Sequence, residues 1–133
     1  MHKLIIFAAL LWSIAGAAGA QQTAPPARVT PLMTRTLPEY PGKEAVLIGV
    51  EYPPGGQDPV HRHHAHGFVY VLEGSIVMGV RGREPVTLTP GQTFYEGPHD
   101  VHTIGRNASL TEPARFLVFL LKDSGEPLLT PVH

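Results

Sequence analysis

The 133-residue chain contains no cysteine, which excludes a disulfide framework, a thiolate nucleophile and a lipidated N-terminal cysteine. It also lacks an excess of charge, because 10 Lys and Arg stand against 11 Asp and Glu, for a net charge of −1. The basic residues are scattered and form no electropositive stripe, so we expect no binding to nucleic acid or to anionic membranes. Without disulfides, stability must come from packing, a bound metal or a partner subunit.

Long apolar runs are also missing, and the longest, residues 4–12, is shorter than the roughly 20 residues that cross a bilayer. Lys3 precedes this run and the small residues Ala18-Gly19-Ala20 follow it, the order typical of a cleavable signal peptide. We therefore predict a signal peptide over residues 1–20, export to the periplasm or the exterior, and no membrane span after cleavage. An uncleaved N-terminal anchor is the alternative, but it leaves the cleavage-site pattern without a purpose.

The remaining chain is long enough for one domain and too short for two. Residues 21–28 are small, polar or proline and predict a flexible segment, followed by one domain over residues 29–133. Short apolar and β-branched stretches separated by glycine and proline predict an all-β sandwich or barrel. The expected strands are residues 44–52, 68–72, 75–80, 84–89, 92–95, 101–104 and 114–122.

Three segments carry more specific expectations. The tight Glu73-Gly74 turn between residues 68–72 and 75–80 predicts a hairpin. Residues 114–122 are almost continuously apolar, so their pattern fits a buried strand or a helix, and their length and flanking Pro113 and Gly125 favour the strand. The tail after Gly125 is expected to cover a sheet edge or to reach a neighbouring chain.

Four histidines lie within six residues: His61, His63, His64 and His66. Neutral imidazole is a common ligand of transition metals, so this density points to a metal site. The surrounding glycine and proline and the β-rich segment that follows argue against a helix. On a strand, His61 and His63 point to one side and His64 and His66 to the other, so one pair should face the interior.

These residues resemble the cupin family, whose first motif combines a glycine, H-x-H, a glutamate three or four residues later and a closing glycine. Gly55 or Gly56, His61 and His63 match it, and Tyr70 to Gly74 resembles the end of the motif. The second motif pairs a glycine with a histidine eleven positions later, as Gly91 and His102 do here. The resemblance covers about residues 52–107. It implies a small jelly-roll β-barrel, and a divalent metal on His61, His63 and His102.

The chain departs from the cupin pattern at Gly67, which stands where the family has its metal-binding glutamate. Three arrangements could complete the site. The preferred one leaves three histidines and an open position for water or substrate, as in many catalytic metal sites. In the others, His66 turns inward through a bulge, or Glu96, near the second motif, supplies a ligand or a proton-transfer group.

The resemblance leaves the reaction open, because one fold hosts many activities. The first hypothesis is an enzyme that uses Fe, Mn, Zn, Ni or Cu to transform a small, oxygen-rich molecule, in the dioxygenase, isomerase or lyase class, with Glu96 as a catalytic residue. The second is a non-catalytic cupin that binds a metal or a small ligand, and the third is a structural partner protein with a degenerate site. Exposed edge strands and the family resemblance also lead us to expect a homodimer.

Overall fold

The computed structural model describes residues 23–133, so the predicted signal peptide, residues 1–20, lies outside the described part of the chain. The described residues form strands joined by turns, and they contain no helix of the length and apolar character that crossing a membrane requires. The strands are β1 (Arg28–Thr36), β2 (Lys43–Tyr52), β3 (His61–Arg62), β4 (Ala65–Glu73), β5 (Ile76–Val80), β6 (Val86–Leu88), β7 (Thr93–Glu96), β8 (His102–Asn107), β9 (Ala114–Asp123) and β10 (Thr130–Pro131).

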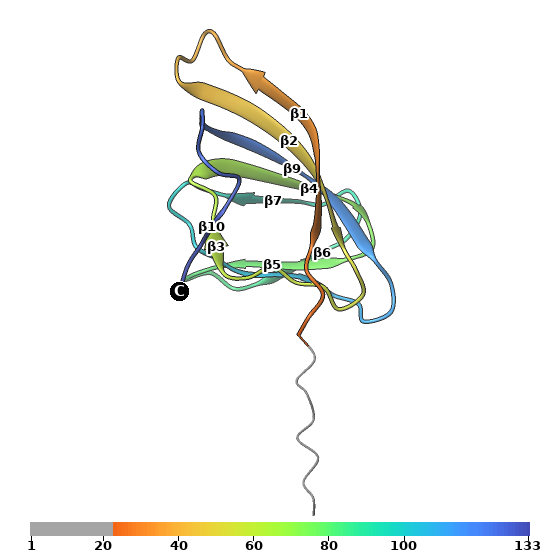
Figure 1. Cartoon of the computed structure of the whole chain (residues 1–133). Helices are drawn as coiled ribbons and strands as arrows, with labels where there is room; N and C mark the ends of the chain where they lie inside the picture. Colours follow the sequence, from red (N-terminus) through yellow and green to blue (C-terminus); the bar gives the residue numbers. More distant parts are fainter. Residues whose placement is uncertain (1–22) are drawn as a thin grey trace, which may run out of the picture.

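The strands form two five-stranded sheets, β1-β2-β9-β4-β7 and β10-β3-β8-β5-β6, in which neighbours are antiparallel. The sheets lie as two layers around a common interior, with the first sheet above the second in the view of Figure 1. This is the all-β jelly-roll fold that the sequence predicts. Strands that are far apart in sequence, such as β2 and β9, lie side by side along their whole length.

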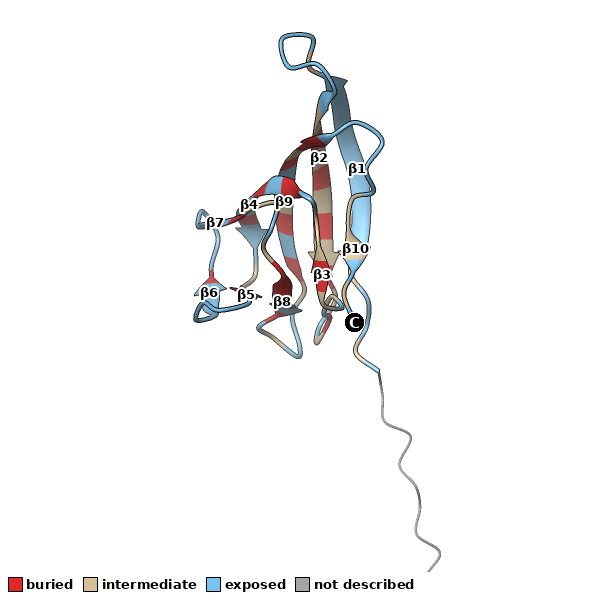
Figure 2. Ribbon diagram, turned by 90° about the vertical axis from the view of Figure 1, so that its left-hand side faces the viewer, coloured by how far each residue is buried: buried red, intermediate tan, exposed pale blue. Residues whose placement is uncertain are grey.

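The core lies between the sheets and is built from alternate residues of the long strands (Figure 2). Because successive side chains of a strand point to opposite faces, the sequence alternation places one apolar set inward. On β2 this set is Val46, Ile48 and Val50, and on β9 it is Phe116, Val118 and Leu120. The ambiguous segment 114–122 is therefore a strand, with alternating rather than continuous burial.

The predicted hairpin at Glu73-Gly74 is wrong. β4 pairs with β7 and β9, whereas β5 pairs with β6 and β8 in the other sheet, so the turn carries the chain between the layers. Gly74 has a φ of 70°, and a Cβ there would lie 2.5 Å from the carbonyl oxygen of Pro113. The glycine is thus required by the turn, but the turn type alone does not say which strands pair.

Two segments without a strong sequence signal complete the sheets. β1 pairs along β2 at the edge of the first sheet, and all nine of its residues are exposed (Figure 2). The tail after Gly125 returns to its own chain, where β10 pairs with β3. This pairing places the C-terminal residues beside His61 and His63.

Candidate metal centre

Three predicted ligands converge inside the barrel. His61 lies on β3 and His102 on β8, and the two residues are direct partners in the antiparallel ladder. His63 follows β3 by one residue and points to the same side as His61. One ligand nitrogen from each of the three rings lies within 4.8 Å of the others. The fold therefore brings together residues that are 41 positions apart in sequence.

The separations between ring nitrogens suit a shared metal ion. The Nε2 atoms of His61 and His63 are 3.0 Å apart, and Nδ1 of His102 lies 3.3 Å from Nε2 of His61. Nitrogens bound tetrahedrally at about 2.0–2.1 Å from zinc are about 3.3 Å from each other. The three rings therefore already have nearly the spacing that coordination of one ion requires.

Main-chain carbonyls accept hydrogen bonds from the Nδ1 atoms of His61 and His63, on the side of each ring away from the cluster. Nδ1 of His61 lies 2.8 Å from the carbonyl oxygen of Pro59, and Nδ1 of His63 lies 2.6 Å from that of Leu128. An Nδ1–H that donates to a carbonyl leaves the lone pair on Nε2, which is the usual arrangement of a metal-binding histidine. The donor set and its supporting hydrogen bonds thus fit a divalent transition metal.

The third ring carries an unsatisfied atom. His102 is 5% exposed, and its Nε2 is the one buried side-chain nitrogen or oxygen among the described residues that has no hydrogen-bond partner. Leaving a buried polar atom unpaired costs about 1–3 kcal/mol. Nδ1 of the same ring is the nitrogen that faces His61 and Glu96, so the orphaned Nε2 is a second atom and not the one counted in the spacing above.

Glu96 places a buried carboxylate beside the histidines. It is buried on β7, directly opposite Gly67 on β4, and its Oε1 lies 2.9 Å from Nε2 of His63. Its Oε2 lies 3.5 Å from Nδ1 of His102. A Cβ at position 67 would lie 3.1 Å from Cγ of Glu96, so the glycine provides the room that the neighbouring carboxylate occupies.

The electrostatics of the cluster favour the ionised form of Glu96. Burial alone raises the pKa of Glu96, but the hydrogen bond with His63 and the charges of the three histidines outweigh it and lower that pKa. Burial lowers the pKa of His102, which keeps this ring neutral. Burial also lowers the pKa of His63, but the hydrogen bond and charge of Glu96 prevail and raise it. Because metal binding needs the deprotonated Nε2 of His63, a bound metal would compete with protonation of this ring.

The other sequence candidates lie elsewhere. His66 is exposed on the outer face of β4, where its Nδ1 lies 2.8 Å from the hydroxyl of Tyr95, and the structure does not bring it to the cluster. No bulge turns it inward, because the burial of β4 alternates regularly from Ala65 to Val71. His64 and His99 are also exposed.

A small cavity of about 50 Å³ adjoins the cluster. Its polar lining comes from the three histidines, Glu96, Tyr52 and Asp58, and the rest is apolar. At about 10–15 Å³ for each water molecule, it has room for about three to five waters. The interior of the barrel thus offers a ligand pocket of a few non-hydrogen atoms.

Tyr52 and Asp58 are site residues that sequence reasoning missed. The buried Tyr52 hydroxyl donates a 2.5 Å hydrogen bond to Oδ2 of Asp58, and burial together with this carboxylate strongly raises the Tyr52 pKa. Because the Tyr52 proton is engaged in this hydrogen bond, the lone pairs of the hydroxyl oxygen remain as acceptors beside the cavity. The inward position of Tyr52 could have been read from the alternation of residues 44–52, but its pairing with Asp58 depends on the loop after β2.

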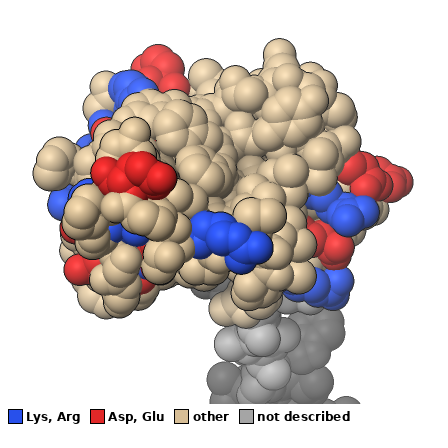
Figure 3. Space-filling view, turned by 90° about the horizontal axis from the view of Figure 1, so that it is seen from above, with Lys and Arg blue, Asp and Glu red and all other residues tan. Residues whose placement is uncertain are grey.

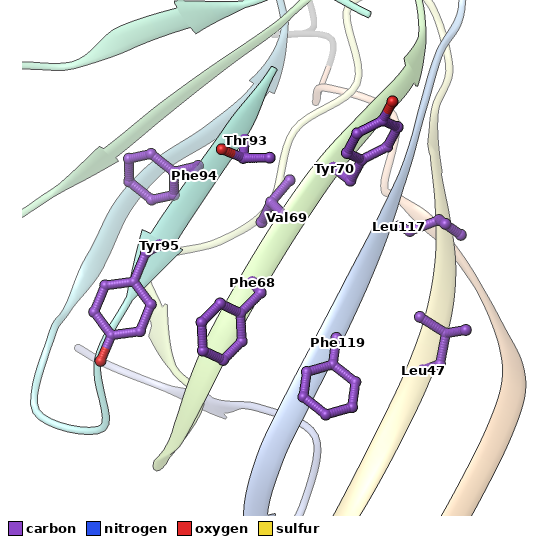
Figure 4. Close-up of a pocket in the computed structure, with 9 residues that line it drawn as sticks. All are labelled: Leu47, Phe68, Val69, Tyr70, Thr93, Phe94, Tyr95, Leu117 and Phe119. Atoms are coloured by element: carbon purple, nitrogen blue, oxygen red, sulfur yellow. The ribbon is translucent and has the colours of Figure 1, made fainter. Parts of the chain in front are cut away.

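A larger groove lies on the outer face of the first sheet, away from the histidines (Figure 4). Phe68, Tyr70 and Tyr95 line it together with Leu117 and Phe119, and their side chains point out of the barrel. Its lining, taken from the described residues, includes no histidine or carboxylate. The groove therefore has the character of a packing surface and not of a metal site.

Comparison with known proteins is consistent with this geometry. Residues 49–120 match the model of the cupin domain, and no curated protein matches the chain in sequence. The solved structures that share the fold include a cupin domain and two enzymes. A cupin domain from Bordetella pertussis Tohama I is 21% identical, with a TM-score of 0.59 and coverage of 76% of this chain and 98% of that one.

The other two are enzymes. The DMSP lyase DddQ from Ruegeria pomeroyi DSS-3 is 23% identical, with a TM-score of 0.58, and the match covers 66% of this chain and 43% of the lyase. An oxalate oxidase in complex with the substrate analogue glycolate is 23% identical, with a TM-score of 0.63, over 92% of this chain and 63% of the oxidase. This chain thus spans less than two thirds of either enzyme. The matched domain covers more than half of the chain, the histidine motifs fall within it, and the chain belongs to the cupin family.

Proposed function

We propose that this protein is an exported, single-domain cupin that binds one divalent transition metal on His61, His63, His102 and Glu96 and transforms a small, oxygen-rich molecule beside it. The observation that carries the proposal is the convergence of three imidazole nitrogens within 4.8 Å at a buried carboxylate. Of the arrangements that the sequence left open, the one with Glu96 accounts best for the contacts of that carboxylate and for the glycine opposite it.

A metal bound here would polarise a carbonyl or hydroxyl, or lower the pKa of a bound water towards neutrality. The residues of the chain orient and enclose the reactant. Carbonyls hold the rings of His61 and His63, and apolar residues such as Val69 and Phe116 keep bulk water out of the cavity. Tyr52 and Asp58 offer acceptors to a hydroxyl or water on the reactant. Glu96, with its lowered pKa, is a carboxylate that can bind metal or accept a proton.

The two enzymes that share the fold support a small reactant. One is named for a lyase reaction on DMSP, and the other holds glycolate as a substrate analogue. At 23% identity each supports the fold and no particular reaction. The cavity of about 50 Å³ favours a molecule of similar or smaller size.

The second candidate is a non-catalytic cupin that captures a metal or a small ligand. The small volume of the cavity, about 50 Å³, favours this binding function, because a site with little free space suits retention of an ion better than turnover of a reactant. The two functions differ in the metal's coordination. An exchangeable water on the bound metal supports the enzyme, and a closed shell without one supports the binder.

Elemental analysis tests the proposal directly. Tag-free protein purified from its own compartment should carry about one transition-metal ion per chain, and removal of the ion by a chelator should lower the melting temperature. A ligand present at about 100 times its Kd stabilises the folded state by about 2.7 kcal/mol. A folded protein that carries no metal and gains no thermal stability when Fe, Mn, Zn, Ni or Cu is added would contradict the proposal.

We also propose that the protein is a homodimer. β1 is exposed along its whole length, and the outer face of the first sheet carries the apolar groove of Figure 4. Viewed from the side of β1 and β2, the middle of the surface is largely uncharged, with Lys, Arg, Asp and Glu mainly at its borders (Figure 3). Exposed edges and large apolar patches are typical of protein interfaces. Light scattering should give about twice the mass of the mature chain, and a monomer at high concentration would contradict this.

A further inference from the structure

The C-terminal segment, residues Leu128 to Val132, lies against the metal centre. The carbonyl of Leu128 accepts the hydrogen bond from Nδ1 of His63, and Leu129 lines the cavity. Thr130 and Pro131 pair with Arg62 and His61 as β10. The segment therefore contacts the candidate metal-binding residue His63 through a main-chain carbonyl, lines the cavity with a side chain, and pairs with β3 in the sheet.

The segment is held at both of its ends. Before it, the buried ammonium group of Lys122 donates 2.5 Å hydrogen bonds to the carbonyl oxygen of Glu126 and to the carboxylate of Glu44. At its far end, the amide of Val132 donates to the carbonyl of Val60. Burying a lysine is costly unless it is paired, so these contacts fix the direction in which the tail leaves β9. The carbonyl of Leu128 is thus placed by the fold and not by chance contact of a loose terminus.

We propose that this C-terminal segment positions His63 for metal binding and determines the size of the ligand that the pocket accepts. The inference deepens the proposed function, on which it rests for the identity of the site. The Leu128 carbonyl is the positioning group, because an acceptor at Nδ1 holds the imidazole in the tautomer whose Nε2 can bind a metal. The Leu129 side chain is the specificity-determining group, because it is one of the walls of a cavity of about 50 Å³.

The two roles can be separated because one belongs to the main chain and the other to a side chain. Replacing Leu129 by alanine removes a wall of the pocket and leaves the Leu128 carbonyl in place. Ending the chain after Pro127 removes the carbonyl and keeps the contact between Lys122 and Glu126. Deletion of His133 alone, which is exposed, is the matched control for the shorter chain. Leu121→Ala is the matched control for Leu129→Ala, because Leu121 is half-buried and lies outside the cavity.

The positioning role is tested by metal affinity and by the His63 ring itself. Loss of the group that supports a metal-binding histidine typically costs 10–100-fold in affinity, so the chain ending at Pro127 should bind Zn²⁺ about 10–100 times more weakly. In metal-free protein, the ¹⁵N signals of His63 should show a protected Nδ1–H in the full chain and its loss in the shorter one. Unchanged Zn²⁺ affinity together with an unchanged His63 spectrum would overturn the positioning role.

A second variant guards against misfolding of the shortened chain. Joining a synthetic tail with an ester in place of the amide between Leu128 and Leu129 weakens the carbonyl as an acceptor and keeps every side chain. It should reproduce the weaker Zn²⁺ binding and the loss of the His63 signal. If the full chain binds no metal but its His63 Nδ1–H depends on the Leu128 carbonyl, the proposed function fails while the positioning role stands.

The size limit is tested with formate, acetate, propionate and butyrate as probes. Binding is followed by the methyl signal of Met78, which lines the cavity, in Zn²⁺-loaded and metal-free protein. The wild-type protein and Leu121→Ala should bind formate or acetate at least about ten times more tightly than butyrate, and Leu129→Ala should lose this preference. The cavity of about 50 Å³ leaves no room for the two added carbons of butyrate, whereas the space opened in Leu129→Ala allows them to be buried favourably. The same chain-length preference in Leu129→Ala as in the wild type would refute the specificity role.

Discussion

The His102→Ala protein should purify with less than about a tenth of the metal that the wild type carries, and His61→Ala should do the same. Each variant removes one of three converging nitrogens, and the remaining ligands cannot hold an ion with comparable affinity. His102 has the larger expected effect of the two, because its ring also lies beside Glu96. Inductively coupled plasma mass spectrometry of tag-free protein measures the metal content, and circular dichroism verifies that the variants keep their β structure.

His64→Ala and His66→Ala are the matched controls, because both rings are exposed and neither belongs to the cluster. Both should keep the wild-type metal content. They also test the strand register. If His64→Ala lost as much metal as His61→Ala, the inward and outward sides of this segment would be exchanged, since a shift of one residue turns every side chain to the other face.

The layers of the fold could be predicted from sequence because a strand has a period of two. Residues 44–52 alternate, and β2 buries the expected set, including Val46 and Val50. Pairing between strands has no such local signal. The Glu73-Gly74 turn looks like a hairpin, yet it crosses between the sheets, because the contacts that decide this come from β9 and β8 much later in the chain. The sequence also gives no clear signal for β1, because all of its residues are exposed and its sequence therefore shows no alternation of apolar and polar residues.

The site shows the same division between local and long-range information. His61 and His63 share a side because they are two residues apart, and the second motif identifies His102. The role of Glu96 depends on the register that sets it opposite Gly67, which no local pattern contains. The carbonyl of Leu128 was beyond reach altogether, because a main-chain group carries no residue identity. Sequence motifs thus identify side chains that bind, while the groups that orient them emerge only from the fold.

Glu96→Ala should weaken metal binding by about 100-fold or more and leave the protein folded. The variant removes the carboxylate that contacts His63 and His102, and losses of supporting groups alone reach 10–100-fold. Glu96→Gln keeps the size of the side chain and removes its charge, so it separates coordination from packing. Affinity follows from competition with a chelator of known strength. Wild-type affinity in both variants would show that three histidines suffice and that the site is open, as the sequence alone favoured.

The most informative variant places a glutamate at position 67 on β4, where the first cupin motif has its metal-binding glutamate. Gly67→Glu alone should lower the free energy of unfolding by about 1–3 kcal/mol, because a Cβ at position 67 would lie 3.1 Å from Cγ and 3.3 Å from Oε1 of Glu96. In the double variant Gly67→Glu/Glu96→Ala both contacts disappear, and the remaining neighbour, Leu120, is at an ordinary 3.5 Å. The double variant should therefore recover most of the metal affinity that Glu96→Ala loses. Rescue would mean that the carboxylate of this cupin has moved from β4 to its partner strand β7, whereas a double variant no better than Glu96→Ala would mean that Glu96 serves another purpose.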